Sequence, residues 1–304
     1  MSYSGPEFDP PQQRRPRRAP LAVGLAALVP GALLGWVVYE GVGKPAARDA
    51  GRAGGTTTRS APASASDDAK VPGPAAPAQP LKGKVVVIDP GHNPGNFRHP
   101  SEINQKVDIG TNWKECDTTG TSTNAGYSEA RFTLDVAHRL RTLLERQGAT
   151  VKLTHDGDRP AWGPCVTQRA RIGNDAHADA AISIHADGAP EGDRGFHVIL
   201  PATVHSGGAD TRPIVASSRT LGERVEKDFA AVTGSAPSNY VGGGTGLDVR
   251  KDLGGLNLST VPKVFIECGN MRDSKDASLL TSGAWRQKAA QGISDGITGF
   301  LRGA

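Results

Sequence analysis

Two histidines and two glutamates stand at positions suited to metal-assisted hydrolysis. His92 and His185 each follow a short run of apolar, largely β-branched residues. Glu267 ends a third such run, and Glu129 begins an amphipathic segment. Two imidazoles and one carboxylate are a common ligand set for a catalytic zinc ion, which keeps a further position for water. This pattern predicts that His92, Glu129 and His185 bind one Zn²⁺ ion and that Glu267 is the general base.

The spacing of these residues leaves a second interpretation open. Steps of 37, 56 and 82 residues separate the four positions. Local zinc motifs such as H-E-x-x-H instead place two ligands on one helix. From residue chemistry alone, each histidine could equally be a hydrogen-bonded structural residue. The zinc hypothesis therefore requires a fold that brings all four side chains to one place.

Apolar strand patterns alternate with helical patterns in the second part of the chain. The expected strands cover residues 84–88, 150–154, 180–184, 195–200 and 263–266, and the expected helices cover 128–147, 166–176, 214–232 and 284–301. This order predicts an α/β fold with an open, mostly parallel twisted sheet and helices on both faces. Ligands of such sheets bind outside the carboxyl ends of the strands, where three of the four residues would lie.

The region before residue 81 has a different composition. Residues 21–39 carry no charge and follow four arginines between Arg14 and Arg18. As a helix this segment would be about 28 Å long, which is enough to span a bilayer with the arginines in the cytoplasm. It is either an uncleaved membrane anchor or the apolar part of a cleaved signal peptide. Both interpretations place the following residues outside the cytoplasm.

We therefore divide the chain into four parts. They are a basic cytoplasmic tail (1–20), a transmembrane or signal segment (21–39), a disordered Ala/Pro/Gly/Ser/Thr linker (40–80) and a catalytic domain (81–304). Residues 1–82 contain ten Lys/Arg and six Asp/Glu, which accounts for the whole net charge of +4. Residues 83–304 therefore carry no net charge, and the charge of the folded domain gives no reason to expect nucleic-acid binding.

The chain has three cysteines. Outside the cytoplasm, pairs of cysteines oxidise. Cys116 and Cys165 both fall in predicted loops, so we expect a disulfide between them that holds the long loop over residues 91–126. Cys268 follows Glu267 at a strand end, and we expect it to be buried and unpaired.

Four motifs together resemble the zinc-dependent N-acetylmuramoyl-L-alanine amidases of the amidase_3 group. They are Asp-Pro-Gly-His (89–92), the inward Glu129, Ser-Ile-His-Ala-Asp (183–187) and Val-Phe-Ile-Glu-Cys-Gly-Asn (264–270). The resemblance extends over about residues 84–302. The stretches 116–123 and 163–165 are similar to actinobacterial, mycobacterial-type members. One departure is Asp187, where the family usually has asparagine.

The resemblance implies a zinc-exopeptidase/amidase-like fold and the same ligand set, with Glu267 as the catalytic glutamate. It also implies hydrolysis of the amide bond between N-acetylmuramic acid and L-alanine, in cell-wall remodelling or autolysis. Peptidoglycan is the expected partner of a monomeric catalytic domain that is membrane-tethered or secreted to the cell wall. Arg250 and Asn257 are candidate substrate contacts.

Two other functions stay open at this point. The chain could be a catalytically silent peptidoglycan-binding or regulatory module, or a zinc carboxypeptidase-like peptidase. A silent module would not need a metal site with an open position. The roles of Asp89, Asp187 and His99 are not determined by the residues alone, although Asp89 could orient His92.

Overall fold

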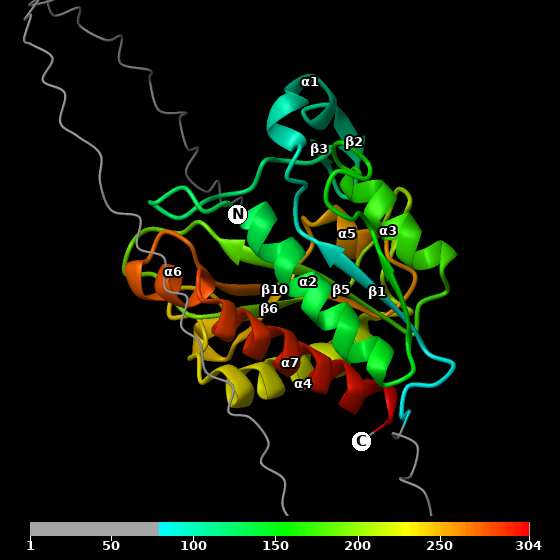
Figure 1. The fold of residues 1–304 in the computed structure, drawn as a ribbon. Helices are drawn as coiled ribbons and strands as arrows, with labels where there is room; N and C mark the ends of the chain where they lie inside the picture. The colour runs from blue at the N-terminus through cyan, green and yellow to red at the C-terminus, as the bar shows by residue number, and fades with distance from the viewer. Residues whose placement is uncertain (1–78, 304) are drawn as a thin grey trace, which may run out of the picture. The chain divides into compact units, whose positions relative to one another are not determined.

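The computed structural model describes residues 79–303, which form a six-stranded sheet with helices on both faces (Figure 1). The strand order is β4-β1-β5-β10-β6-β9. Their bounds are β1 (Val85–Pro90), β4 (Thr150–Leu153), β5 (Ala180–Asp187), β6 (His197–Pro201), β9 (Leu247–Arg250) and β10 (Lys263–Asn270). Two hairpins lie outside this sheet: β2 (Lys106–Asp108) with β3 (Trp113–Glu115), and β7 (His205–Ser206) with β8 (Ala209–Asp210).

The predicted mostly parallel sheet is confirmed. Strands β4, β1, β5 and β10 run parallel, whereas β6 pairs antiparallel with β10 and β9 pairs parallel with β6. The antiparallel pairing of β6 was not predicted, because side-chain periodicity carries no information on strand direction. Strand β9, which has four residues, was not predicted either. Since β1, β5 and β10 are parallel neighbours, the residues at their carboxyl ends meet at one edge.

The long helices begin and end close to their predicted limits. They are α2 (Glu129–Arg146), α3 (Val166–Asp175), α4 (Val215–Thr233) and α7 (Gly283–Leu301). The short ones are η1 (Asn96–Arg98), α1 (Pro100–Ile103), η2 (Gly242–Gly244), α5 (Gly254–Asn257) and α6 (Ser274–Leu280). On α2, Phe132, Val136 and Leu140 are fully buried. Their helical spacing forms a single apolar stripe that packs against the sheet.

The two faces of the sheet have different covers. Helices α2, α7 and α4 lie next to one another across one face, and α3 and α5 lie toward the other (Figure 1). Ile182 and Ile184 of β5 pack into the core under α2, α4 and α7, whereas Ala181 packs on the α3 side. Because successive strand residues point to opposite faces, Ser183 and His185 share the face of Ala181.

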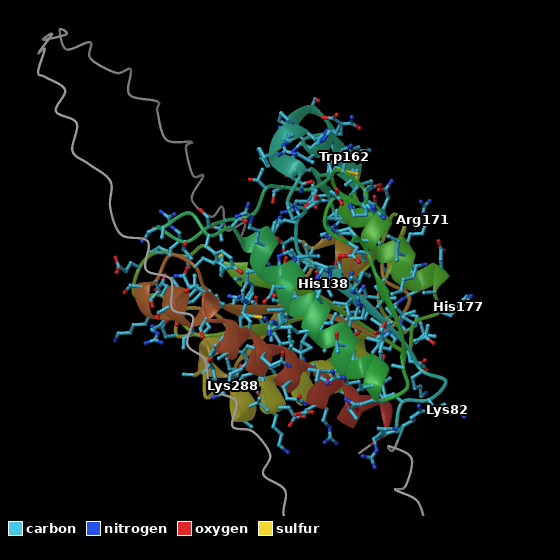
Figure 2. The ribbon with its side chains drawn as sticks, viewed as in Figure 1. Lys82, His138, Trp162, Arg171, His177 and Lys288 are labelled. Carbon is cyan, nitrogen blue, oxygen red and sulfur yellow. A yellow bond between two sulfur atoms is a disulfide. The ribbon has the colours of Figure 1, made fainter. Side chains whose placement is uncertain are left out.

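The outer sides of the helices are polar. Figure 2 shows His138 on α2 and Lys288 on α7 among the side chains at the surface. Trp162 lies beside the ring of His99, with 6.2 Å between the ring centroids. This places Trp162 at the end of the domain that carries α1 (Figure 2).

The N-terminal expectations stay predictions. The basic tail, the apolar segment over residues 21–39 and the linker up to residue 78 lie outside the described residues. Within residues 79–303, no helix is both long and apolar enough to cross a membrane. The Leu81 side chain is fully buried, and its backbone N–H donates to the carbonyl of Gln147.

Candidate active site

His92, Glu129 and His185 come together at the carboxyl edge of the sheet. One ligand-type atom from each lies within 4.8 Å of the other two. The Oε1 atom of Glu129 is 3.1 Å from His92 Nε2 and 2.9 Å from His185 Nδ1. The two imidazole rings are nearly perpendicular, with centroids 5.0 Å apart. Two ring nitrogens and one carboxylate oxygen therefore converge on one point, as a three-ligand metal site requires.

Two glycines allow these side chains to approach so closely. A Cβ atom at Gly91 would lie 2.4 Å from the Cε1 atom of His185. A Cβ atom at Gly120 would lie 2.6 Å from His92 Cδ2 and 2.7 Å from Glu129 Oε2. His92 itself has a φ of 60°, in the left-handed region that non-glycine residues seldom adopt. The Pro90-Gly91-His92 turn is thus shaped to aim the imidazole back across the strand ends.

The surroundings of Glu129 explain a carboxylate on the buried side of the first turn of α2. Its oxygens accept hydrogen bonds from the backbone N–H groups of Thr121 (2.9 Å) and Ala186 (3.3 Å). Burial alone would raise the pKa of Glu129, but His92 and His185 hold it well below its usual range. Burial lowers the pKa of His92, but Glu129 and Asp117 outweigh this effect and raise it to about 10. The site therefore stabilises positive charge, which fits a cation.

Glu267 lies beside this cluster, on the neighbouring strand. It is opposite His185 in the pairing of β10 with β5. Its Oε2 atom is buried and has no partner among the described residues. Burial, with the charges of Glu129 and Asp187, raises the pKa of Glu267 well above its ordinary value. A carboxylate in this environment is a stronger base than one in water.

A cleft of about 260 Å³ exposes the cluster and Glu267 to solvent. Asp187, Arg250 and Phe265 contribute to its walls. Asp187 also accepts a hydrogen bond of 2.8 Å from the hydroxyl of Tyr240. A wider groove of about 1230 Å³ shares Gly120 and Thr121 with the cleft. The cluster thus lies in a depression that continues along the surface.

The two predicted substrate contacts have different positions. Arg250 lines the cleft and pairs with Asp252 through two hydrogen bonds of 2.9 and 2.7 Å. Asn257 is fully buried, and its amide donates to the carbonyls of Lys251 (2.9 Å) and Ile109 (3.2 Å). In this structure Asn257 therefore joins two loops and is not a wall residue of the cleft, which differs from our expectation.

A buried ionic network under the cluster was not predicted. Asp89 is 1% exposed, and it accepts hydrogen bonds from Arg169 (2.8 Å) and Lys263 (3.1 Å). Burial would raise the pKa of Asp89, but these two cations hold it far below its usual range. Arg169 also donates to the carbonyl of His92 (3.1 Å) and to Asp117 (2.9 Å). The network ties the strand ends to the loops around the site.

The sequence contains one weak indication of this network, in the residue pattern of β10. Lys263, Phe265 and Glu267 alternate with apolar residues on β10, so all three share the face of the sheet that carries His185. A lysine at the first position of a buried strand requires an anionic partner. The sequence does not show which of the acidic residues that partner is.

The predicted Cys116–Cys165 disulfide is confirmed. It joins residues 49 positions apart, with 4.3 Å between their Cα atoms. Cys165 precedes α3, which carries Arg169, so the disulfide ties the loop over residues 91–126 to that helix. Cys268 is buried and unpaired, as predicted. The long loop is thus attached both covalently and through Arg169, rather than being a free surface segment.

Comparisons with known proteins agree with this geometry. Residues 86–299 match the family described as Amidase_3, N-acetylmuramoyl-L-alanine amidase. The N-acetylmuramoyl-L-alanine amidase Rv3717 of Mycobacterium tuberculosis is 39% identical over 222 residues, which cover 73% of this chain and 88% of the relative.

Two solved structures are also similar. The crystal structure of the N-acetylmuramyl-L-alanine amidase Ami1 from Mycobacterium smegmatis has a TM-score of 0.67 at 38% identity, covering 74% of this chain and 99% of that one. The apo form of Ami1 from Mycobacterium abscessus has a TM-score of 0.65 at 38% identity, covering 73% of this chain and 100% of that one. On the strength of the family match and the 39% identity, this chain belongs to the N-acetylmuramoyl-L-alanine amidase family.

Proposed function

We propose that this protein hydrolyses the amide bond between N-acetylmuramic acid and L-alanine in peptidoglycan, with a zinc ion held by His92, Glu129 and His185. The observation that carries the proposal is the convergence of two imidazole nitrogens and one carboxylate oxygen within 4.8 Å at the base of an open cleft. Nitrogen and oxygen donors in this number are the set that catalytic zinc sites use.

The donor set and its surroundings fit the ion. A zinc ion bound there would polarise the amide carbonyl and lower the pKa of water. Glu267, whose Oε2 atom has no hydrogen-bond partner within residues 79–303, takes the proton from the attacking water. It then delivers that proton to the leaving nitrogen of L-alanine as the C–N bond breaks. The products are the free lactyl carboxylic acid of the sugar and a peptide with a new amino terminus.

The shape of the depression supports a long, branched substrate. The cleft of about 260 Å³ has room for the groups on either side of one amide bond. The connected groove of about 1230 Å³ gives space for more of the glycopeptide. Phe97 is 63% exposed at this groove, and Arg98 lies over its ring. Exposed aromatic and polar groups together suit a sugar–peptide chain.

We further propose that the catalytic domain works outside the cytoplasm, where peptidoglycan is located. The Cys116–Cys165 disulfide supports this compartment, because such bonds persist under oxidising conditions. The uncharged segment over residues 21–39 provides the anchor or export signal in this proposal.

Digestion of purified peptidoglycan with the zinc-loaded full chain tests the reaction. We expect mass spectrometry to find stem peptides that begin with a free L-alanine amino group, beside glycan strands with free lactyl carboxylates. A carboxypeptidase would instead shorten the stem peptides from their other end, and a silent module would release nothing. Either of these results would reject the proposed reaction. Treatment with a chelator is expected to abolish release, and added zinc to restore it.

A further inference from the structure

The two ring nitrogens of His185 point to different partners. Nδ1 lies 2.9 Å from Glu129 Oε1, and Nε2 lies 3.2 Å from the hydroxyl oxygen of Ser183. Ser183 and His185 are alternate residues of β5 and therefore share one face of the sheet. Phe265 of β10 stacks on the His185 ring, with 5.3 Å between the centroids and 11° between the planes. The ring is therefore held between two polar contacts and an aromatic face.

The next group along this line is the carboxylate of Asp89. The hydroxyl of Ser183 lies 3.0 Å from Asp89 Oδ2, and the two residues are paired in the register of β1 with β5. Both side chains are 1% exposed. Asp89 also accepts hydrogen bonds from Arg169 and Lys263, so it is an acceptor surrounded by donors. An ionised carboxylate has no hydrogen to give, so the Ser183 hydroxyl donates to Asp89.

This direction fixes the remaining bond. When the Ser183 hydroxyl hydrogen points to Asp89, its oxygen lone pairs face His185 Nε2. A favourable contact then requires a hydrogen on Nε2. An imidazole that binds a metal ion is neutral and carries only one hydrogen. With that hydrogen on Nε2, Nδ1 would keep a lone pair for an ion held at the point where His92 and Glu129 converge.

We propose that Asp89 and Ser183 are positioning residues that act through His185: they hold its ring in place and keep Nδ1 available as the metal donor. The proposal rests on the metal-binding role proposed for His185. It differs from the expectation that Asp89 orients His92. A different group orients His92. Its Nδ1 lies 3.1 Å from the carbonyl oxygen of Thr118, so its Nε2 is the nitrogen that faces Glu129.

We call the chain of contacts from Asp89 through Ser183 to His185 the relay. The Ser183→Ala variant tests it in the full chain with two readouts that do not involve turnover. We expect the zinc dissociation constant, measured by competition with a chelator, to rise roughly 10- to 100-fold, as is typical when the partner of a ligating histidine is lost. In ¹⁵N-histidine-labelled protein, we expect wild type to show a His185 Nε2–H signal that is protected from exchange with water. Ser183→Ala is expected to lose this protection.

Two further variants keep the result interpretable. Ser294→Ala removes another fully buried hydroxyl, which accepts from Gln147 on the far side of the sheet, and it is expected to leave zinc affinity unchanged. Ser183→Cys replaces the hydroxyl by a slightly larger thiol that makes weaker hydrogen bonds at the same place, so its loss of affinity is expected to be smaller. It also replaces Ser183→Ala if that variant does not fold.

The relay is rejected if Ser183→Ala and Ser183→Cys both bind zinc as tightly as Ser294→Ala, or if the protected Nε2–H signal persists without the hydroxyl. Failure of the proposed function looks different. A wild-type protein that binds zinc and shows the protected signal but releases no peptide contradicts the amidase assignment and leaves the relay intact. If wild type binds no zinc, its imidazole spectrum still decides whether Nε2–H donates to Ser183.

Discussion

At the scale of single residues, most of the buried charges of the site are balanced by charges of opposite sign. Glu129 is 4% exposed and is balanced by two histidines, and Asp89 is balanced by Arg169 and Lys263. Glu267 is the exception, because its nearest charged neighbours include two further carboxylates that raise its pKa. A buried carboxylate with a raised pKa and a free oxygen is the usual signature of a proton-transfer group.

Replacing Glu267 by glutamine tests this difference. The amide has nearly the same shape but cannot accept the proton, so we expect kcat on soluble muropeptides to fall roughly 10²- to 10⁴-fold. Zinc content, measured on the purified variant, is expected to stay at the wild-type value because Glu267 is not a ligand in our proposal. Glu223→Gln, an exposed change on α4, is the matched control. Turnover near wild type in Glu267→Gln would contradict the general-base role.

We expect His155 to make the folded state less stable in acid. Its side chain is 2% exposed and Nε2 donates to the carbonyl of Pro90, whereas Nδ1 has no partner among the described residues. Burial, with the Arg169 charge, lowers its pKa from 6.5 to about 4. Between these pH values the unfolded chain binds a proton that the folded chain does not, so stability falls as the pH falls from about 6.5 to about 4. The loss amounts to roughly 3 kcal/mol.

Urea unfolding of wild type and His155→Gln, both with chelator present to remove metal effects, measures this loss. The variant is expected to lose less stability than wild type between pH 6.5 and pH 4, and to show little difference in slope above pH 7. Parallel curves over the acidic range would show that His155 is not responsible.

At the scale of elements, the helix layer depends on close contact between α4 and α7. A Cβ atom at Gly296 of α7 would lie 2.6 Å from the Cα of Val225 on α4, and one at Gly292 would lie 2.8 Å from the Cα of Phe229. The obstacle in both cases is backbone, which cannot rotate away. These glycines therefore set the distance between the two helices that cover the core beside β5 and β10.

Gly296→Ala is expected to lower the free energy of unfolding by about 1–3 kcal/mol, because the added methyl group forces the helices apart. Gly299 is a matched control on the same helix, since a Cβ there would only approach the Cδ atom of the Arg224 side chain, at 3.8 Å. Gly299→Ala is expected to leave stability unchanged or raise it by up to about 1 kcal/mol. Chemical denaturation compares the two, and an equal effect of both substitutions would argue against close packing as the cause.

At the scale of the whole molecule, the excess positive charge and the long uncharged segment both precede the catalytic domain in the sequence. The excess of Lys/Arg lies in residues 1–82, and the domain that follows is neutral overall. A neutral domain suits a glycopeptide better than a polyanion. The family match begins at residue 86, after the uncharged segment over residues 21–39 that we propose as the anchor or export signal.

Cell fractionation tests the proposed location of the protein. When the full chain is produced in bacteria, an uncleaved anchor is expected to leave it in the membrane pellet after an alkaline wash, whereas a cleaved signal is expected to release a shortened protein. Amino-terminal sequencing separates these two results. The double variant Leu33→Arg/Leu34→Arg is expected to show neither membrane retention nor cleavage, because charge near the centre of an apolar span makes its insertion into the membrane costly. Recovery of intact wild-type protein from the cytosol would contradict the proposed location.

Much of this protein could be predicted from the sequence, for local reasons. The apolar runs that end at His92, His185 and Glu267 define buried strands because alternation and turn residues act over a few positions. The stripe of α2 and the glycine after its end define that helix in the same way. Four motifs in the correct order were sufficient to identify the family, and two loop cysteines were sufficient to identify the disulfide.

What the sequence could not determine depends on which distant residues become neighbours. The side-chain partners of Asp89 are Thr154, Arg169, Ser183 and Lys263, which lie 65 to 174 positions away, and periodicity does not specify such pairings. For the same reason, Asn257 could be placed in a loop but not in the buried junction that it occupies, and β6 could be identified as a strand but not as an antiparallel one. The residue types were sufficient to predict the chemistry that we propose for the site, because it depends on which groups are present. Only the tertiary structure decided which ring nitrogen of each histidine faces Glu129, and which carboxylate oxygen lacks a hydrogen-bond partner within residues 79–303, because those properties depend on contacts between strands and loops.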